Sequence, residues 1–352
     1  MSKRRKPLFA RRRASAGHSS KGRPLKPVTI KRWTGHPQLI LDVPALRTGR
    51  YYVDDRQVGG DAPKDFIWVY QTRPGGVRPA DWRKWPAYIA KVGHQFYPAE
   101  SVSEQVITRV GQMLGMRIAD SQLMICAEQL RFMSRFFLRN EEILNHGAEI
   151  LMGYLADKDF VEGVAAEKAE KTLFTFQVFC TAIRAIFPAD HSEILHGFVR
   201  MIGFDALVGN QDRHFYNWGV ITHPTGAVSP RFAPIYDTAR GLFWNSTEQG
   251  LAKFSQAESL TAYVRNSRPE IGWDGWKESD GELRHFDLIA SIAASDTTYW
   301  GWLENLGKTA MASLADCEGM IDAEFGDLLS ETRRKLIKQC LRMRFQRYVE
   351  VF

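Results

Sequence analysis

The sequence predicts an α+β protein with two lobes, a small β-rich lobe with one inserted helix and a larger, mostly helical lobe. Short β-branched and aromatic runs bounded by Gly and Pro, at 66–70 and 87–92, indicate strands in the first part of the chain. Apolar residues recur at helical spacing over 101–115, and again through most of the chain after about residue 140. We therefore expect one lobe over 36–138 and the other over 139–352.

The chain has 352 residues and a formal net charge of +7, and that charge is unevenly distributed. Residues 1–32 hold 12 basic residues and no acidic one, which leaves 35 basic against 40 acidic residues in the rest. We expect a disordered basic tail over 1–35, which contacts nucleic acid or an acidic partner, on a mildly acidic body. An acid-free start rich in Arg and Ser is also typical of an organelle transit peptide, so that alternative stays open.

Cysteine usage and hydropathy indicate the cellular compartment of the protein. No apolar run approaches the roughly 18 residues of a membrane span, so no membrane span is expected. The cysteines form no CxxC pair and have apolar neighbours, which is typical of reduced core residues in a cytoplasmic protein. They are Cys126, Cys180, Cys317 and Cys340.

Further elements follow from the same periodicities. In the small lobe we expect strands at 122–126 and 130–138, and a helix that ends at Gly115. In the large lobe we expect long helices over 140–157, 165–187 and 191–209. Ser330 is a good N-cap for a final helix, whose apolar face is predicted to consist of Leu336, Ile337, Cys340, Leu341, Phe345 and Tyr348. Its basic residues predict a solvated face, with a nucleic-acid or partner surface as the alternative; they are Arg333, Arg334, Lys335, Lys338, Arg342, Arg344 and Arg347.

The residues with the clearest chemical signal lie in 203–220, where an apolar helical run ends and polar residues follow at once. Asp212 is followed five residues later by Asn217, and a second acid, Asp237, closes an apolar strand over 232–236. Phosphoryl transfer needs one carboxylate at the acceptor hydroxyl, and an amide oxygen with another carboxylate to hold magnesium. Hard oxygen ligands of this kind suit Mg²⁺. Asp212 or Asn217 alone would also serve in an ordinary turn.

A phosphoryl-transfer site also needs a cation on the phosphates of the donor. Lys91 ends the strand 87–92, and Glu104 lies on the next helix, where it could hold the lysine in place. The alternative for Glu104 is a capping box with Ser101. The turn 57–64, with Gly59, Gly60 and Lys64, is the candidate cover for the phosphates, although Gly-Gly also marks ordinary hairpins.

These stretches resemble one known family. The sequence GNQDRHFYNWGV at 209–220, followed by PIYDTARG at 234–241, resembles the HipA-like serine/threonine kinases, many of which are toxins of toxin–antitoxin pairs. The stretch KVGHQFYPAESVSEQVITRVGQMLG at 91–115 is similar to the same family, and the resemblance covers roughly 57–245. It implies a bilobal protein-kinase-like fold that uses ATP and Mg²⁺.

The resemblance also implies roles for single residues. Asp212 would be the catalytic base, Asn217 and Asp237 would bind magnesium, and Lys91 would contact the ATP phosphates. The hinge that holds adenine through its backbone would fall at 135–139, which includes Phe137 and Leu138. His214 is expected to be a structural hydrogen-bonding residue rather than an acid–base group.

The resemblance is incomplete. The family's Gly-rich loop often holds a regulatory serine, but 57–64 contains no Ser or Thr, and we find no counterpart of the family's extra N-terminal subdomain. The family implies a protein substrate with a Ser or Thr, translation proteins among them, and an antitoxin protein as a partner. Two rivals remain at this point. One is a phosphoinositide-type lipid kinase, whose Asp-Arg-x-x-x-Asn loop is similar, and the other is a non-catalytic module with a nucleic-acid-binding arm.

Overall fold

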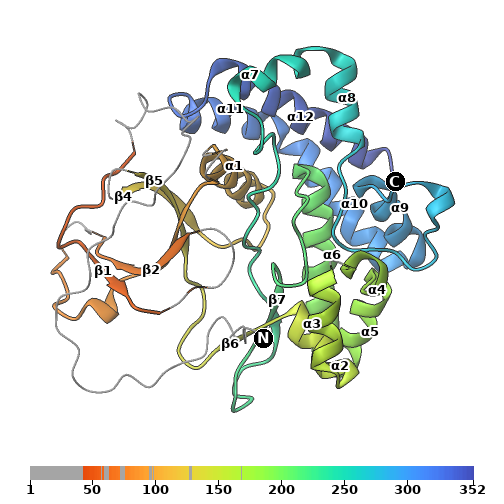
Figure 1. The fold of residues 1–352 in the computed structure, drawn as a ribbon, viewed down its shortest axis with the longest axis horizontal. Helices are drawn as coiled ribbons and strands as arrows, with labels where there is room; N and C mark the ends of the chain where they lie inside the picture. The colour runs from red at the N-terminus through yellow and green to blue at the C-terminus, as the bar shows by residue number, and fades with distance from the viewer. Residues whose placement is uncertain are drawn as a thin grey trace.

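The computed structural model describes residues 43–352 except 57, 59–62, 72–75, 95, 96, 98, 127, 128 and 168. The predicted basic tail and the predicted turn glycines, Gly59 and Gly60, lie outside the described residues. Figure 1 shows a sheet-containing lobe on the left and a larger helical lobe on the right. The predicted α+β architecture of two lobes is therefore confirmed. No helix in the described part of the chain combines the length and hydropathy needed to cross a membrane.

The small lobe is built on a five-stranded antiparallel sheet with the order β1-β2-β3-β5-β4. Its strands are β1 (Tyr51–Asp54), β2 (Lys64–Val69), β3 (Ala87–Val92), β4 (Ser121–Cys126) and β5 (Gln129–Arg135). Lys64 pairs directly with Lys91 in the register of β2 and β3. Because directly opposed residues of an antiparallel pair point to the same face, both lysines lie on one face of the sheet.

Helix α1 (Glu100–Met113) joins the two lobes into one core. It lies between the sheet and the helical lobe in Figure 1, and its apolar residues belong to the same buried cluster as those of the large lobe. Gly111 allows this close approach, since a Cβ there would meet the Phe204 ring at 3.0 Å. Arg109 adds a bidentate ion pair with Glu324 of the helical lobe at 2.6 and 2.7 Å. Contacts with the sheet on one side and with the helical lobe on the other thus fix the position of α1.

The large lobe combines a small sheet with a set of helices. The three-stranded sheet has the order β6-β7-β8 and consists of β6 (Ile143–His146), β7 (Gly219–Thr222) and β8 (Arg231–Phe232). The first group of helices is α2 (Gly147–Leu155), α3 (Lys158–Glu167), α4 (Glu170–Leu173), α5 (Phe176–Ile186) and α6 (His191–Val208). The second group is α7 (Glu248–Leu251), α8 (Ala257–Arg265), α9 (His285–Ser295), α10 (Thr297–Ala312), α11 (Leu314–Phe325) and α12 (Glu331–Val349). Short 3-10 turns lie at Trp82–Lys84, Ala252–Ser255 and Glu278–Asp280.

Several predicted boundaries were wrong. The predicted helix 140–157 begins only at Gly147, because 143–146 pair with β7 as strand β6. The predicted helix 165–187 is three helices, and the Thr175 hydroxyl caps the last of them by accepting a hydrogen bond from the backbone N–H of Val178. Strand β5 stops at Arg135 rather than at 138. Of the strand predicted over 232–236, only Phe232 belongs to a strand, β8, since Pro234 has no N–H to donate to a ladder.

The final helix confirms its predicted cap and apolar face but corrects its predicted polar face. The Ser330 hydroxyl accepts from the backbone N–H of Arg333, and all six predicted apolar residues are buried. Arg333 and Arg344, predicted to be solvated, are buried as well. The Arg344 guanidinium donates to the carbonyl oxygens of Ala206 and Val264 at 2.8 and 3.1 Å. Buried carbonyl acceptors, which a sequence does not reveal, account for its position. The four cysteines are free and buried, as predicted.

Candidate active site

The loop that follows α6 is held by the helix itself. Asp205, one turn before the helix end, is buried and accepts from Arg213 at 2.8 and 3.0 Å and from the Asn210 amide at 2.9 Å. Gly209 ends the helix in the left-handed region with φ 71°, where a glycine is favoured. The chain therefore turns back on α6 and presents Asp212 beside the end of that helix.

Arg213 ties this loop to the segment that carries Asp237. One amino group of its buried guanidinium donates to the carbonyl oxygen of Asn217 at 2.6 Å and to that of Tyr236 at 2.7 Å. Nε, Nη1 and Nη2 of Arg213 thus all donate inside the protein. The role of Arg213 in the structure is to hold two chain segments together.

Asn217 lies directly behind Asp212. Its side-chain nitrogen donates to the backbone carbonyl of Asp212 at 2.7 Å, and the residue is almost fully buried. Because the amide nitrogen is fixed in this way, the amide oxygen remains as the acceptor on the other side of the side chain. That arrangement fits a ligand that needs a hard, neutral oxygen, such as Mg²⁺.

Asp237 sits in a strained backbone conformation at the meeting point of the two lobes. Its φ is 56°, in the left-handed region that non-glycine residues seldom adopt. Two residues earlier, Ile235 exchanges backbone hydrogen bonds with Arg117 and Ala119 of the small lobe, at 2.7 and 2.9 Å. Together with the Arg213 bond to Tyr236, these contacts hold the strained residue in place. Strain of this kind is concentrated at functional sites.

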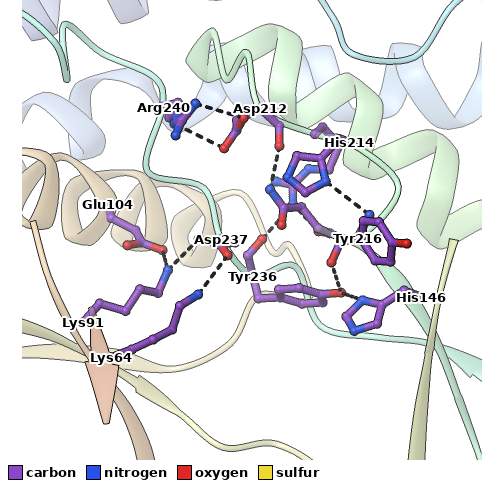
Figure 2. A network of polar contacts seen from close by, with 12 residues as sticks. Lys64, Lys91, Glu104, His146, Asp212, His214, Tyr216, Tyr236, Asp237 and Arg240 are labelled. Carbon is purple, nitrogen blue, oxygen red and sulfur yellow. Dashed lines mark hydrogen bonds and ion pairs between the residues drawn. The ribbon is translucent and has the colours of Figure 1, made fainter. Parts of the chain in front are cut away.

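Lys91 and Lys64 reach Asp237 from the sheet (Figure 2). The Lys91 ammonium lies 2.7 Å from Asp237 Oδ1 and 2.6 Å from Glu104 Oε1, and Lys64 Nζ lies 4.0 Å from Asp237 Oδ2. Helix α1 begins at Glu100 after the N-cap Ala99, which makes no side-chain capping bond. Glu104 is therefore one turn inside the helix and faces Lys91, so the alternative of a capping box with Ser101 is wrong.

The charges in this cluster shift one another's pKa values. Burial alone would lower the pKa of Lys91, but the carboxylates of Asp237 and Glu104 raise it above its ordinary value. Burial raises the pKa of Glu104 to about 7, although Lys91 opposes the shift. Burial would also raise the pKa of Asp237, but Lys91 and Lys64 hold it below its usual range. The lysine thus stays charged, and Asp237 stays ionised.

Asp212 has a different environment. Burial, together with the charges of Asp237 and Glu270, raises its pKa to about 7, and Arg240 opposes that shift. Arg240 forms two contacts of 3.2 Å with the Asp212 carboxylate. A carboxylate with a pKa near neutrality is suited to accept a proton from a hydroxyl group.

The structure therefore brings together six of the predicted site residues: Asp212, Asn217, Asp237, Lys91, Glu104 and Lys64. Phe137 and Leu138 lie between the lobes, where they pack against Leu144, Ile221 and Ala233. The two turn glycines lie outside the described residues. No group of three or more His, Cys, Asp and Glu side chains in the described part of the chain is placed to hold a metal ion. Asn217 and Asp237 offer one amide oxygen and one carboxylate, and Mg²⁺ in proteins often has only a few protein ligands and keeps several of its waters.

Comparisons with known proteins identify the family and the fold of the chain. The family model described as the HipA-like C-terminal domain matches residues 58–301. The chain belongs to this family. No curated protein matches the chain. Among solved structures, the Helicobacter pylori proinflammatory kinase CtkA is similar, with a TM-score of 0.68 and 16% identity over 88% of this chain and 96% of that chain. A HipA chain from a Shewanella oneidensis complex of HipA, HipB and operator DNA has a TM-score of 0.48 and 15% identity, over 94% of this chain and 74% of that one. The HipA-like family and the bilobal kinase-like fold are thus established.

Sequence reasoning missed some residues of the candidate site. Arg240 was visible only as part of the stretch after Asp237, and its contact with Asp212 depends on the fold. Tyr236 was assigned only to a strand, yet its hydroxyl lies 2.8 Å from His146 Nδ1 and donates to the Tyr216 carbonyl at 3.3 Å. His214 accepts from the backbone N–H of Tyr216 at 3.3 Å, which is consistent with the structural role expected for it.

His285 was missed as well. From its buried position we predict that the stability of the protein depends on pH. Its ring lies 2.9 Å from the carbonyl of Asn210 and 3.1 Å from the Ser267 hydroxyl, directly behind the loop of Asp212. Burial, with Arg344 nearby, lowers its pKa to about 3. The unfolded chain would bind a proton near pH 6.5, so stability falls as the pH drops from about 6.5 towards 3, by up to about 1.4 kcal/mol per pH unit from this group.

We expect a His285→Gln variant to show a shallower loss of stability between pH 6.5 and pH 4.5 than the wild type, in urea unfolding at several pH values. The substitution removes the titrating ring and keeps a side chain that can donate to the Asn210 carbonyl. His191, which is half-buried at the start of α6, provides the control substitution, His191→Gln. Equal pH slopes for the wild type and His285→Gln would contradict the assignment.

Proposed function

We propose that this protein is an ATP- and Mg²⁺-dependent serine/threonine protein kinase of the HipA-like type. The observation that carries the proposal is the convergence of Lys91 with Glu104, Asp237, Asn217 and Asp212 in one site between the lobes. These are the groups that phosphoryl transfer from ATP requires, and they come from four separate segments of the chain.

Each group has a distinct proposed task. Lys91, held by Glu104, moves its ammonium from Asp237 to the donor phosphates when ATP binds. Asn217 and Asp237 would hold magnesium, which when bound neutralises charge on the β- and γ-phosphates. Lys64 and the turn before it cover the phosphates, and the backbone near Phe137 and Leu138 receives the adenine. We propose 36–138 as the nucleotide lobe and 139–352 as the lobe that carries Asp212.

The chemical step is a transfer of one phosphoryl group. Asp212 orients the acceptor hydroxyl of a Ser or Thr and receives its proton. The hydroxyl oxygen forms a bond to the γ-phosphorus while the bond between that phosphorus and the β–γ bridging oxygen breaks, so ADP leaves. Positioning and charge neutralisation supply most of the rate gain, because the protein forms no covalent bond to the phosphoryl group.

The proposed partners extend beyond ATP. A protein substrate, for which translation proteins are the first candidates, and an antitoxin protein follow from the HipA-like family. The basic tail over 1–32, which is outside the described residues, would contact nucleic acid or an acidic partner through its charge. A cytoplasmic location fits the four buried free cysteines.

Incubation with γ-labelled ATP and Mg²⁺ tests the proposal, with a lysate protein fraction in one arm and phosphoinositide vesicles in the other. We expect label on serine or threonine of protein, and none after EDTA is added. Label in the lipid alone would favour the lipid-kinase alternative. Failure to label either acceptor, together with no Mg²⁺-dependent ATP binding, would favour a non-catalytic module.

A further inference from the structure

One cation at the site has no part in the roles assigned so far. Arg240 lies three residues after Asp237, and its guanidinium contacts both oxygens of the Asp212 carboxylate. Nη1 lies 3.2 Å from Oδ1, and Nε lies 3.2 Å from Oδ2. Figure 2 shows the two side chains pointing at each other, on the other side of Asp237 from the two lysines. The arginine is thus next to the proposed acceptor of the substrate's proton.

The guanidinium has donors left over. A guanidinium offers several N–H groups in a fixed plane, and Arg240 uses Nε and Nη1 on Asp212. Nη2 has no hydrogen-bond partner among the residues that the structure describes. The side chain is 39% exposed, so a ligand can reach these donors from the solvent.

An aromatic support holds Arg240 without using its donors. The guanidinium carbon lies 5.1 Å from the ring centroid of Trp244. The Trp244 ring in turn meets the rings of His94 and Tyr97 edge-on, at centroid distances of 6.1 and 5.8 Å. A cation over an aromatic face is stabilised while its N–H groups remain free to bind in their own plane. The arrangement preserves the orientation of Arg240 for a ligand.

The charge balance of the site indicates which ligand. Lys64 and Lys91 both lie on the Asp237 side, and the guanidinium of Arg213 is buried and committed to Asp205 and two carbonyls. On the side of the site where the acceptor hydroxyl would bind, Asp212 forms an ion pair with Arg240, and it forms no other ion pair among the described residues. During transfer, the γ-phosphoryl group with its negatively charged oxygens moves from ADP towards the acceptor oxygen beside Asp212. A cation already placed beside Asp212 would stabilise the charge on those oxygens.

We propose that Arg240 is a further catalytic residue, whose guanidinium contacts the γ-phosphoryl group during transfer while it remains hydrogen-bonded to Asp212. The inference rests on the proposed kinase function and adds a second role to that site. The oxygen of the acceptor bonds to phosphorus, the bond to ADP breaks, the proton goes to Asp212, and Arg240 gains and loses no atom. Guanidinium groups suit this task because their planar donors match the oxygens of a phosphoryl group.

Acidic neighbours define the rival interpretation. Glu100 interacts with Arg240 through its charge, and Asp237 and Glu270 face Asp212. In that interpretation, Arg240 is an inhibitory contact that blocks Asp212 until a substrate displaces it. The two interpretations predict opposite effects of a substitution at Arg240. Removal of an inhibitory contact raises the transfer rate, whereas removal of a catalytic cation lowers it.

Single-turnover phosphoryl transfer at saturating Mg·ATP separates these cases. We expect Arg240→Ala and Arg240→Gln to lower the transfer rate by about 100-fold, within the range seen when one charge-stabilising donor is lost. The KM for ATP, the affinity for ADP and the Tm should change little. Arg240→Lys should recover part of the rate. Millimolar guanidinium ion should restore part of the rate of Arg240→Ala but not that of Asp212→Asn, a response that a purely structural role would not produce.

Arg265→Gln, which alters an exposed arginine on α8, is the matched control. If Arg240→Gln transfers phosphate at the wild-type rate or faster, while the wild type is active, this inference is overturned and the proposed function stands. Absence of guanidinium rescue together with full recovery in Arg240→Lys would also overturn the contact with the phosphoryl group. A wild-type protein that transfers no phosphate overturns the proposed function and this inference together.

Discussion

An Asp212→Asn variant is expected to transfer phosphate about 100 to 10,000 times more slowly than the wild type, because an amide cannot accept the proton of the acceptor hydroxyl. Its affinity for Mg·ATP should be nearly unchanged. Asp212 holds its place through its backbone carbonyl, which Asn217 contacts, and that bond survives the substitution. Transfer rates from labelled ATP and calorimetric ATP affinities measure the two properties separately.

Asp274→Asn is the matched control for this experiment, since Asp274 is an exposed acid on the same lobe. It should transfer phosphate at the wild-type rate. A wild-type rate in the folded Asp212→Asn variant would remove Asp212 from the chemistry and leave Asp237 as the acid to examine.

Loss of Lys91 is expected to have two effects with different origins. A Lys91→Met variant should lose phosphoryl transfer and most of its ATP affinity, because the ammonium that meets the donor phosphates is gone. It should also be less stable by about 3 kcal/mol, since Glu104 is buried and loses its ion-pair partner. Urea unfolding and ATP titration measure these effects independently.

The double variant Lys91→Met, Glu104→Gln separates the two effects. Removing the uncompensated carboxylate should recover much of the stability, but ATP binding and transfer should remain lost. If the double variant is no more stable than Lys91→Met, the cost did not arise from Glu104. If it regains transfer, Lys91 has no role at the phosphates.

The residues of the candidate site could be predicted from the sequence because they lie in short polar segments between strongly periodic ones. Asp212 and Asn217 share one loop at the end of an apolar helix, and Asp237 closes an apolar run. Lys91 and Glu104 follow from a strand and a helix whose periods differ clearly. These local sequence patterns can be recognised without knowing which other segments of the chain pack against them.

The features that escaped prediction depend on contacts between distant segments. Strand β6 exists because β7, more than 70 residues later, pairs with it. Arg344 is buried because carbonyl groups of α6 and α8 accept its hydrogen bonds, whereas a charged residue in isolation indicates a solvated position. The contact between Arg240 and Asp212 likewise follows the strained turn at Asp237, and no residue pattern around Asp237 predicts that turn.

Magnesium-dependent binding of ATP, measured by calorimetry for the wild type and for Asp237→Asn with and without Mg²⁺, tests the central claim most directly. The wild type should bind ATP more tightly when Mg²⁺ is present, and Asp237→Asn should lose that increase while it stays folded. A wild type that binds no ATP in the presence of Mg²⁺, or an Asp237→Asn variant that keeps the full magnesium-dependent increase, would contradict the assignment of this cluster as the phosphate and metal end of a nucleotide site.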